Sequence, residues 1–503
     1  MLFNSLQYLV FFPLVVLLYY VLPWQKARNL MLLAASFIFY MCWNPVYIIL
    51  MLGCITISYL DGRFIEIARR EEKTKVAKDE RRTGKPRTYL VVTAAVMIAV
   101  LVYFKYAGMI ADTLTSLFGL FHIQIRIPEN DVILPVGISF FTFQALSYDI
   151  DVYRGEVECE HDFLKFALFI SFFPQLVAGP IERSGHLLHQ FDEKHPFNPE
   201  GIVRGLMMML WGYFMKVVIA DRISIFVGAA YSYYNDYEGL TLIIATFLFG
   251  IQIYCDFAGY TNIAIGSAQV LGINLIQNFE EPYLAVSVAD FWRRWHISLT
   301  NWFRDYVYFP LGGSRCSRLK HYRNIMIVFL ISGLWHGASW TYVIWGGLNG
   351  LWQVLGDMTK VFRKNALSKM QVKTDSLGYK LIRIFITLIL VDFTWIFFRA
   401  PTVSDAIGVI KQIGKSFNPW VLFDGTLYTL GLSSLDYWLM IASILILLAV
   451  DILHEKKISI RTALLHQPAV VRWIICYGCL FAVIVFGVYG PAYNAESFIY
   501  FQF

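Results

Sequence analysis

Long apolar stretches alternate with short polar segments along the whole chain. The apolar stretches fall near residues 5–23, 29–43, 46–60, 89–110, 162–180, 202–234, 239–255, 324–345, 346–359, 384–398, 435–453 and 473–490. A helix needs about 20 apolar residues to cross a bilayer, and shorter or interrupted stretches are typical of re-entrant segments. The pattern therefore predicts an all-α, polytopic membrane bundle of about 11–13 spanning or re-entrant helices. Because no internal repeat is present, we expect residues 1–503 to form a single membrane domain.

The polar segments carry most of the Lys and Arg residues. Residues 62–88 contain ten Lys/Arg against five acids, and residues 287–323 and 360–383 contain seven Lys/Arg each. Positively charged loops stay in the cytoplasm, so these segments are predicted to be cytoplasmic, and both the N-terminus and the tail 491–503 extracytoplasmic. Charge pairs four residues apart in the basic loop 62–88 indicate a solvated helix. The mixed aromatic and basic residues of 287–323 predict an amphipathic or re-entrant segment on the cytoplasmic side.

The composition excludes several other classes of protein. Hydrophobic residues make up 57% of the chain and charged residues 16%, whereas soluble domains carry about 25% charged residues. A secreted domain, a cytosolic enzyme and a disordered scaffold are therefore excluded. The net charge of +6 lies in loops that set topology, so we expect no nucleic-acid partner. The seven cysteines show no CxxC…CxxC or CxxC…HxxxH pattern, and we expect neither a metal site nor a disulfide framework.

One histidine stands inside an apolar stretch. His336 lies in ISGLWHGASW, thirteen residues after Arg323, the last basic residue before this stretch. At about 1.5 Å per residue, this places it about 20 Å into a hydrocarbon core about 30 Å thick, where an ionisable residue is a candidate for function. A neutral imidazole can accept a proton from an attacking hydroxyl, so His336 is a candidate general base. The alternative is a histidine that hydrogen-bonds two helices together.

A second histidine lies in a basic, aromatic segment. His296 stands in FWRRWHISLTNWFRDYVYF, which is too polar to span a membrane. Guanidinium groups suit phosphate, so Arg293, Arg294 and Arg304 are candidates for binding a phosphorylated donor. The alternative, which composition alone favours slightly, is an amphipathic helix that lies in the membrane interface.

Other polar residues inside apolar stretches have two interpretations. Asp256, Tyr260 and Gln144 either line a cavity or hydrogen-bond helices to one another. Trp335 and Ser339, which lie close to His336, are further candidates for lining a tunnel. The sequence contains no GxSxG elbow, Walker A loop or HExxH motif.

Several segments together are similar to the membrane-bound O-acyltransferase (MBOAT) family. They are VGISFFTFQALSYDIDVYRG, FFPQLVAGPIER, YCDFAGYTNIAIG, FWRRWHISLTNWFRDYVYFPLGGSR and SGLWHGASWTYVIWGG. The opening MLFNSLQYLVFFPLVVLLYYVLP and the ending ESFIYFQF resemble the bacterial subgroup whose membrane proteins serve O-acetylation of alginate or peptidoglycan. The resemblance covers nearly the whole chain.

This resemblance implies a fold and an activity. The helices would surround a central funnel or tunnel in the bacterial cytoplasmic membrane, embedded in lipid. The activity would be transfer of an acetyl group from cytoplasmic acetyl-CoA, a substrate rather than a bound cofactor, for O-acetylation of an extracytoplasmic polysaccharide. The family's essential histidine falls on His336 and the subgroup's second histidine on His296, which would orient the thioester or stabilise developing charge. An extracytoplasmic SGNH-type acetyltransferase would be the partner.

The C-terminal tail adds a more specific expectation. Tyr500 lies in AESFIYFQF, which resembles the tyrosine-bearing end of a small partner protein in the teichoic acid D-alanylation system. We expect Tyr500 to enter the outer funnel and carry the acyl group as a covalent relay. The alternative is an aromatic anchor at the membrane interface.

Three rival functions remain open from the sequence. The first is D-alanyl transfer from a carrier protein to teichoic acid. The second is a membrane transporter or exporter, for which paired intramembrane charges and inverted repeats would be evidence. The third is a scaffold that docks a soluble acetyltransferase.

Overall fold

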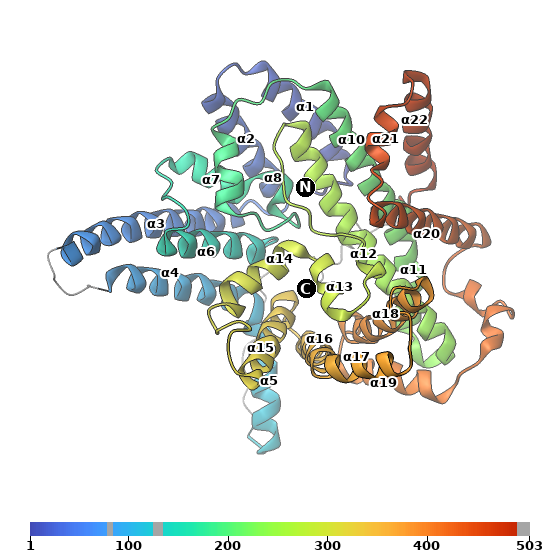
Figure 1. Cartoon of the computed structure of the whole chain (residues 1–503). Helices are drawn as coiled ribbons and strands as arrows, with labels where there is room; N and C mark the ends of the chain where they lie inside the picture. The colour runs from blue at the N-terminus through green and yellow to red at the C-terminus, as the bar shows by residue number, and fades with distance from the viewer. Residues whose placement is uncertain (78–83, 124–133, 490–503) are drawn as a thin grey trace. The chain divides into compact units, whose positions relative to one another are not determined.

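The computed structural model describes residues 1–77, 84–123 and 134–489 (Figure 1). Within these residues, regular secondary structure is helical, apart from one isolated β-bridge between Phe279 and Trp295. The prediction of an all-α protein is therefore confirmed. The chain forms two compact units, one of residues 1–206 with 264–276, and the other of residues 207–263 with the chain from Gln277 onward. The prediction of a single membrane domain stays a prediction.

The first unit is built from an N-terminal series of helices. These are α1 Leu6–Val21, α2 Gln25–Met41, α3 Tyr47–Ala77, α4 Lys85–Leu101, η1 Val102–Tyr106, α5 Ala107–Leu120, α6 Ile138–Arg154, α7 Phe163–Ser171, α8 Phe173–Leu176, α9 Ser184–Leu187 and η2 Leu188–Phe191. Helices α3, α4 and α6 pack side by side (Figure 1). The polar half of α3 continues the helix to Ala77 and includes an ion pair between Arg70 and Glu66 of 2.6 Å. The helix predicted in the basic loop is thus confirmed up to Ala77.

The second unit contains the elements that hold both candidate histidines. These are η3 Phe214–Ala220, α11 Asp221–Ser232, η4 Tyr234–Asp236, η5 Pro282–Leu284, α13 Val288–Arg294, α14 Ile297–Phe303, η6 Arg304–Tyr308, α15 Arg318–His336, α16 Trp340–Met358, α17 Lys360–Lys369, α18 Leu377–Arg399, α19 Val403–Lys415, η7 Pro419–Leu422, η8 Thr426–Thr429, α20 Ser434–Glu455, α21 Ile460–Leu465 and α22 Ala469–Phe486. Two further helices, α10 Pro199–Tyr213 and α12 Gly239–Val270, contribute residues to both units.

Seven of the described helical segments are long and apolar enough to cross a membrane. They are Tyr47–Thr74, Lys85–Leu120, Pro199–Ser232, Gly239–Val270, Leu377–Arg399, Ser434–Glu455 and Ala469–Phe486. Other predicted apolar stretches form shorter helices, such as α1, α2 and α7, as expected of elements that do not span a bilayer alone. The protein is therefore a multi-pass membrane protein.

Helices α15 and α16 pack closely against each other in the second unit. A side chain on Gly333 would collide with the backbone of Tyr342, and one on Gly346 would collide with the backbone of Phe329. Small residues let helix backbones approach closely, so these two glycines set the distance between α15 and α16. The hydroxyl of Ser339 caps α16 by accepting from the backbone N–H of Thr341.

Candidate active site

His296 lies at the sharp turn between two short helices. Ser287 caps α13 by accepting from the backbone N–H of Asp290 at 3.1 Å, and α13 ends at Arg294. His296 then adopts the left-handed conformation with a φ of 45°, and α14 begins at Ile297. A non-glycine residue in this region is uncommon and often marks a functional site. The segment predicted as amphipathic or re-entrant is thus a pair of short helices with His296 at their junction.

The imidazole of His296 is buried and hydrogen-bonded. The residue is 1% exposed, and its Nδ1 lies 3.3 Å from Oδ1 of Asn278. Burial lowers the pKa of His296 to about 3, because an imidazolium would lose its hydration. His296 is therefore neutral at physiological pH.

His336 is the last residue of α15 and lies close to His296. It is 3% exposed, and the centroids of the two imidazole rings are 6.3 Å apart. The family resemblance assigned both histidines to one reaction, but no spacing in the sequence required the two rings to lie close together. Their proximity is the main result that the fold adds.

Aromatic rings surround the two histidines. We call the group the histidine cluster; its members are His296, His336, Trp335, Trp345, Phe257 and Phe398. The ring of His336 lies 5.1 Å from that of Trp335 and 5.0 Å from that of Trp345, measured between centroids. Both imidazole rings are thus buried, and the neutral form of an imidazole is the one that accepts a proton.

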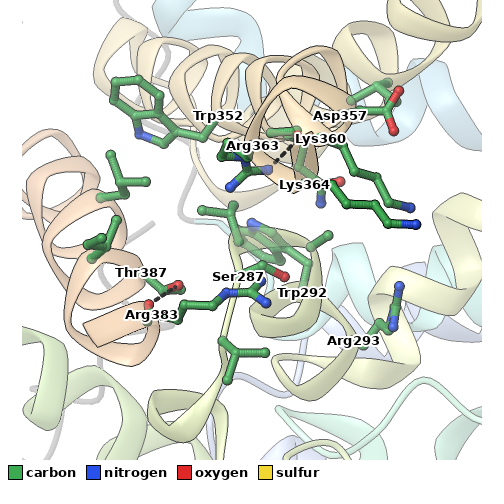
Figure 2. A pocket seen from close by; sticks show the side chains of 18 of the residues that line it. Ser287, Trp292, Arg293, Trp352, Asp357, Lys360, Arg363, Lys364, Arg383 and Thr387 are labelled. Carbon is green, nitrogen blue, oxygen red and sulfur yellow. Dashed lines mark hydrogen bonds between the residues drawn. The ribbon is translucent and has the colours of Figure 1, made fainter. Parts of the chain in front are cut away.

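A large basic cavity reaches the histidine cluster. Its volume is about 1340 Å³, and His296 and Ser332 are among its lining residues. Ser332 lies on α15 one turn before His336, which does not itself line the cavity. Figure 2 shows cations from α13, α17 and α18 arranged around this space.

The lining of the basic cavity has a strong excess of positive charge. Six Lys/Arg residues line it, against two acids, Asp357 and Asp375; the six are Arg293, Arg304, Lys360, Arg363, Lys364 and Arg383. Arg304 forms an ion pair with Asp305 at 2.8 Å, and the other five are not ion-paired with any residue that the structure describes. A group of cations without acidic partners suits a ligand with several phosphate groups.

Four of the six cations were missed by the sequence analysis. Lys360, Arg363, Lys364 and Arg383 lie in the segment 360–383, whose charge was used only to assign topology. The signal that connects them to His296 is that 287–323 and 360–383 were both predicted to be cytoplasmic. Segments on one side of a membrane can share one site.

Arg294 has a different role from Arg293 and Arg304. It forms ion pairs with Glu455 of α20 at 2.6 Å and with Asp290 at 3.4 Å, and it does not line the basic cavity. Glu455 also pairs with Lys380 of α18 at 3.2 Å. Its guanidinium joins α13 to α20, and the prediction that Arg294 binds the donor stays a prediction.

Asp256 belongs to a separate buried group of charges. We call Lys216, Asp221 and Asp256 the lysine triad, since Nζ of Lys216 lies 2.7 Å from Asp221 and 2.6 Å from Asp256. All three side chains are at most 4% exposed. None of them lines the basic cavity.

The other predicted tunnel residues also lie outside the lining of the basic cavity. Tyr260 is buried on α12, Trp335 belongs to the histidine cluster and Ser339 caps α16. In the first unit, Gln144 of α6 donates to the backbone oxygen of Phe169 at 2.8 Å. Their role as tunnel lining stays a prediction. Tyr500 and the tail 491–503 lie outside the described residues.

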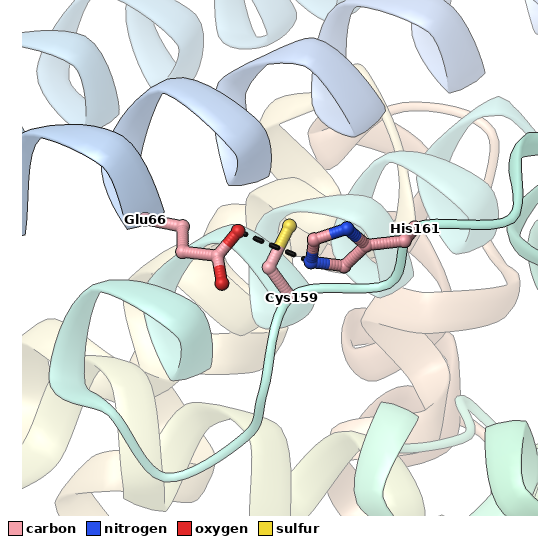
Figure 3. Close-up of side chains that lie close together, drawn as sticks. All are labelled: Glu66, Cys159 and His161. Atoms are coloured by element: carbon pink, nitrogen blue, oxygen red, sulfur yellow. Dashed lines mark ion pairs between the residues drawn. The ribbon is translucent and has the colours of Figure 1, made fainter. Parts of the chain in front are cut away.

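Three potential metal ligands lie close together in the first unit. Glu66, Cys159 and His161 approach one another within 4.8 Å (Figure 3). Nη1 of Arg63 lies 2.6 Å from Nδ1 of His161, and because the guanidinium only donates, that nitrogen accepts. Nε2 of His161, which lies 3.2 Å from Glu66, then carries the ring hydrogen. A nitrogen that binds a metal needs a lone pair instead.

Comparisons with known proteins agree with this architecture. Residues 154–394 match the model of MBOAT, the membrane-bound O-acyltransferase family. A probable alginate O-acetylase AlgI of Pseudomonas aeruginosa is 34% identical over 422 residues, which cover 84% of this chain and 76% of that protein. A peptidoglycan O-acetyltransferase of Helicobacter pylori is 33% identical over 443 residues, covering 82% and 79%. A teichoic acid D-alanyltransferase of Bacillus subtilis is 27% identical over 260 residues, covering 48% and 65%.

The helical membrane fold and these similarities define a class of enzyme, a polytopic membrane acyltransferase. The chain belongs to the MBOAT family. The rival prediction of a transporter is therefore wrong, although the lysine triad supplies paired buried charges of the kind it called for, and so is that of a chain that is only a scaffold for a soluble acetyltransferase.

Proposed function

We propose that this enzyme transfers an acetyl group from cytoplasmic acetyl-CoA toward the O-acetylation of an extracytoplasmic polysaccharide. The observation that carries the proposal is that a cavity lined by six Lys/Arg is also lined by His296, whose ring lies 6.3 Å from that of His336. The relatives that match over most of the chain are named for O-acetylation of alginate and of peptidoglycan, which supports acetyl as the group and a polysaccharide as the acceptor.

The basic cavity would hold the donor by its phosphates. Coenzyme A joins several phosphate groups to a long uncharged arm that ends in the thioester. The cations of α17 and α18 suit the phosphates, and the arm would extend along the apolar lining toward His296. Since both basic segments that line the cavity are predicted to be cytoplasmic, the donor would enter from the cytoplasm.

The two histidines would divide the chemistry. His336 takes the proton from the attacking hydroxyl, whose oxygen forms a bond with the acetyl carbonyl carbon. The carbon–sulfur bond breaks, and the thiolate of coenzyme A receives the proton from His336. His296 holds the thioester in place beside His336. The protein supplies positioning and a water-free site, and the thioester supplies the driving force.

A transfer assay with purified protein tests the donor. The full-length protein in lipid nanodiscs is incubated with acetyl-CoA labelled in the acetyl group, and release of free coenzyme A and transfer of label are measured. We expect turnover with acetyl-CoA and none with a D-alanyl carrier protein. Turnover with the carrier protein alone would replace this proposal by D-alanyl transfer, the activity for which the Bacillus subtilis relative is named.

The proposal extends to the acceptor side through the tail. Tyr500 would carry the acetyl group to an SGNH-type acetyltransferase or directly to the polysaccharide. The substitution Tyr500→Phe keeps the aromatic ring and removes the hydroxyl. We expect intact-protein mass spectrometry to show an acetyl adduct on the wild type and none on this variant. Full surface acetylation in cells that express Tyr500→Phe would contradict the relay.

A further inference from the structure

The hydrogen-bond partner of His296 selects which ring nitrogen carries the proton. We propose that Asn278 is a positioning residue that fixes His296 as the Nδ1–H tautomer and leaves the lone pair on Nε2. This role rests on the proposed acetyl transfer, in which His296 holds the donor. Asn278 stands in NFEEPYL, a stretch in which no familiar motif marks it.

The orientation of the Asn278 amide follows from its neighbours. Asn278 is 1% exposed, and its Oδ1 accepts from the backbone N–H of Ser298 at 3.1 Å and from the Ser298 hydroxyl at 2.7 Å. A backbone N–H can only donate, so the amide atom that faces it must be the oxygen. The same oxygen lies 3.3 Å from Nδ1 of His296.

The tautomer of His296 follows from that orientation. An amide oxygen accepts hydrogen bonds and does not donate them, so Nδ1 of His296 must carry a hydrogen. In a neutral imidazole the lone pair is then on Nε2. The rings of Phe257 and Trp335, at 4.7 and 5.8 Å from the His296 ring, restrict its rotation but do not select a tautomer.

The backbone holds Asn278 opposite His296. The backbone N–H of Ile297 donates to the oxygen of Asn278 at 2.9 Å, and that of Glu280 donates to Arg294 at 3.0 Å. These bonds enclose the isolated bridge between Phe279 and Trp295. The pairing also stabilises the left-handed conformation of His296, which few non-glycine residues adopt.

The tautomer determines what His296 can bind. A lone pair on Nε2 accepts a hydrogen bond, and the arm of coenzyme A contains amide N–H groups that donate one. The other tautomer would present an N–H to these same groups and repel them. Asn278 therefore acts on the donor through His296 without touching it, as residues behind a metal-ligating histidine do in other proteins.

Histidine NMR tests the tautomer without reference to activity. The full-length protein is labelled with ¹⁵N and ¹³C in histidine, and the His296 signals are identified by subtracting the spectrum of His296→Gln. We expect the Nδ1–H tautomer in the wild type and in Ser298→Ala, the control that alters the same amide oxygen without touching His296. We expect a mixture of tautomers in Asn278→Leu. A wild-type signal from the Nε2–H tautomer would overturn the proposal.

Kinetics with acetyl-CoA then separate a positioning role from a structural one. We expect Asn278→Leu to lower kcat/KM by at least about 10-fold and Ser298→Ala by less than about 2-fold. Asn278→Asp keeps the acceptor and places a negative charge beside the ring. It should retain the tautomer and shift the acid limb of the pH profile to higher pH.

The results distinguish failure of the proposed acetyl-CoA donor from failure of the inference about Asn278. If the wild type shows the Nδ1–H tautomer and does not turn over acetyl-CoA, the proposed donor fails and the role of Asn278 in fixing His296 stands. If acetyl-CoA is turned over and Asn278→Leu leaves the His296 signals unchanged, the inference about Asn278 fails alone. Should Asn278→Leu not fold, Asn278→Asp decides, and an unshifted acid limb overturns the inference.

Discussion

The histidine cluster and the lysine triad are two groups of buried polar side chains in the same unit. They differ in whether their members form ion pairs. In the lysine triad, Lys216 lies between the carboxylates of Asp221 and Asp256, so each charge has its opposite within 2.7 Å. In the histidine cluster, His296 and His336 lie among aromatic rings, burial lowers the pKa of His296, and the basic cavity reaches His296. The paired charges join η3, α11 and α12, whereas His296 lines a cavity.

This comparison corrects a sequence argument. Asp256 and His336 were both selected because they lie inside apolar stretches, and an ionisable residue there is a functional candidate by default. The structure separates them by their partners. The carboxylate of Asp256 is paired with Lys216 and so holds helices together, whereas the role of His336 as general base stays a prediction.

The largest expected effect comes from removing the base. His336→Gln keeps a polar side chain of similar size and should lower kcat by about 100- to 10,000-fold, because general-base catalysis contributes about that much. The thermal unfolding temperature should stay close to that of the wild type. Both are measured on protein in nanodiscs with acetyl-CoA. Unchanged turnover in this variant would remove the histidine cluster from the mechanism.

The second prediction concerns stability at the lysine triad. Lys216→Met leaves two buried carboxylates without their cation and should lower the free energy of unfolding by about 3–5 kcal/mol. Thermal unfolding and yield in the membrane measure this. The double variant Lys216→Met with Asp256→Asn should recover part of the loss, since it removes one unpaired charge. A stable, folded and inactive Lys216→Met protein would instead place the triad in the reaction.

The third prediction concerns Lys360 and Lys364, two exposed lysines that line the basic cavity. Lys360→Ala combined with Lys364→Ala should raise the KM for acetyl-CoA by roughly 5-fold at low salt and leave kcat unchanged, because exposed charges each contribute about 1 kcal/mol or less. Added salt should reduce the difference by screening. The matched control is Lys411→Ala on α19, an exposed lysine that does not line the basic cavity. An equal rise in KM from Lys411→Ala would show that the net charge of the protein, and not the cavity lysines, attracts the donor.

The smallest expected effect is a pH dependence of stability. Burial lowers the pKa of His296 from 6.5 to about 3, so between these values the unfolded chain binds a proton that the folded protein does not. The contribution of His296 to stability therefore rises with pH up to about 6.5 and is level above it. The unfolding temperature of His296→Gln should fall less than that of the wild type between pH 7 and pH 5, and exposed His466→Gln serves as control. Parallel pH profiles for all three proteins would contradict a buried, neutral His296.

The fold class could be predicted from the sequence because membrane-spanning helices are recognised by their length and apolar composition. The seven helices that meet both criteria all contain a predicted apolar stretch, while the boundaries moved with context. The polar part of α3, for example, continues a spanning helix to Ala77 because its charges pair along the helix, as Glu66 and Arg70 do. Division into two compact units depends on contacts between distant segments, which periodicity does not encode.

The candidate site was predictable in its histidines and not in its surroundings. His336 could be selected because it lies inside an apolar stretch, and His296 because it lies in a basic, aromatic segment. Lys360 and Arg383 did not, because a basic residue in a loop has an adequate explanation in topology. Asn278 gave no signal, since its importance lies in one side-chain oxygen that meets a residue eighteen positions away.

The glycine contact between α15 and α16 limits how the proposed acetyl site of this enzyme can be widened. Gly333 and Gly346 already bring the two backbones together, so no side chain remains at that contact to be shortened or enlarged. In the proposed transfer, space for a longer acyl chain beside His336 would come from the bulky rings of Trp335, Trp345 or Phe398. We expect smaller residues at those three positions to admit a longer acyl group, and larger residues at the two glycines to disrupt the helix pair.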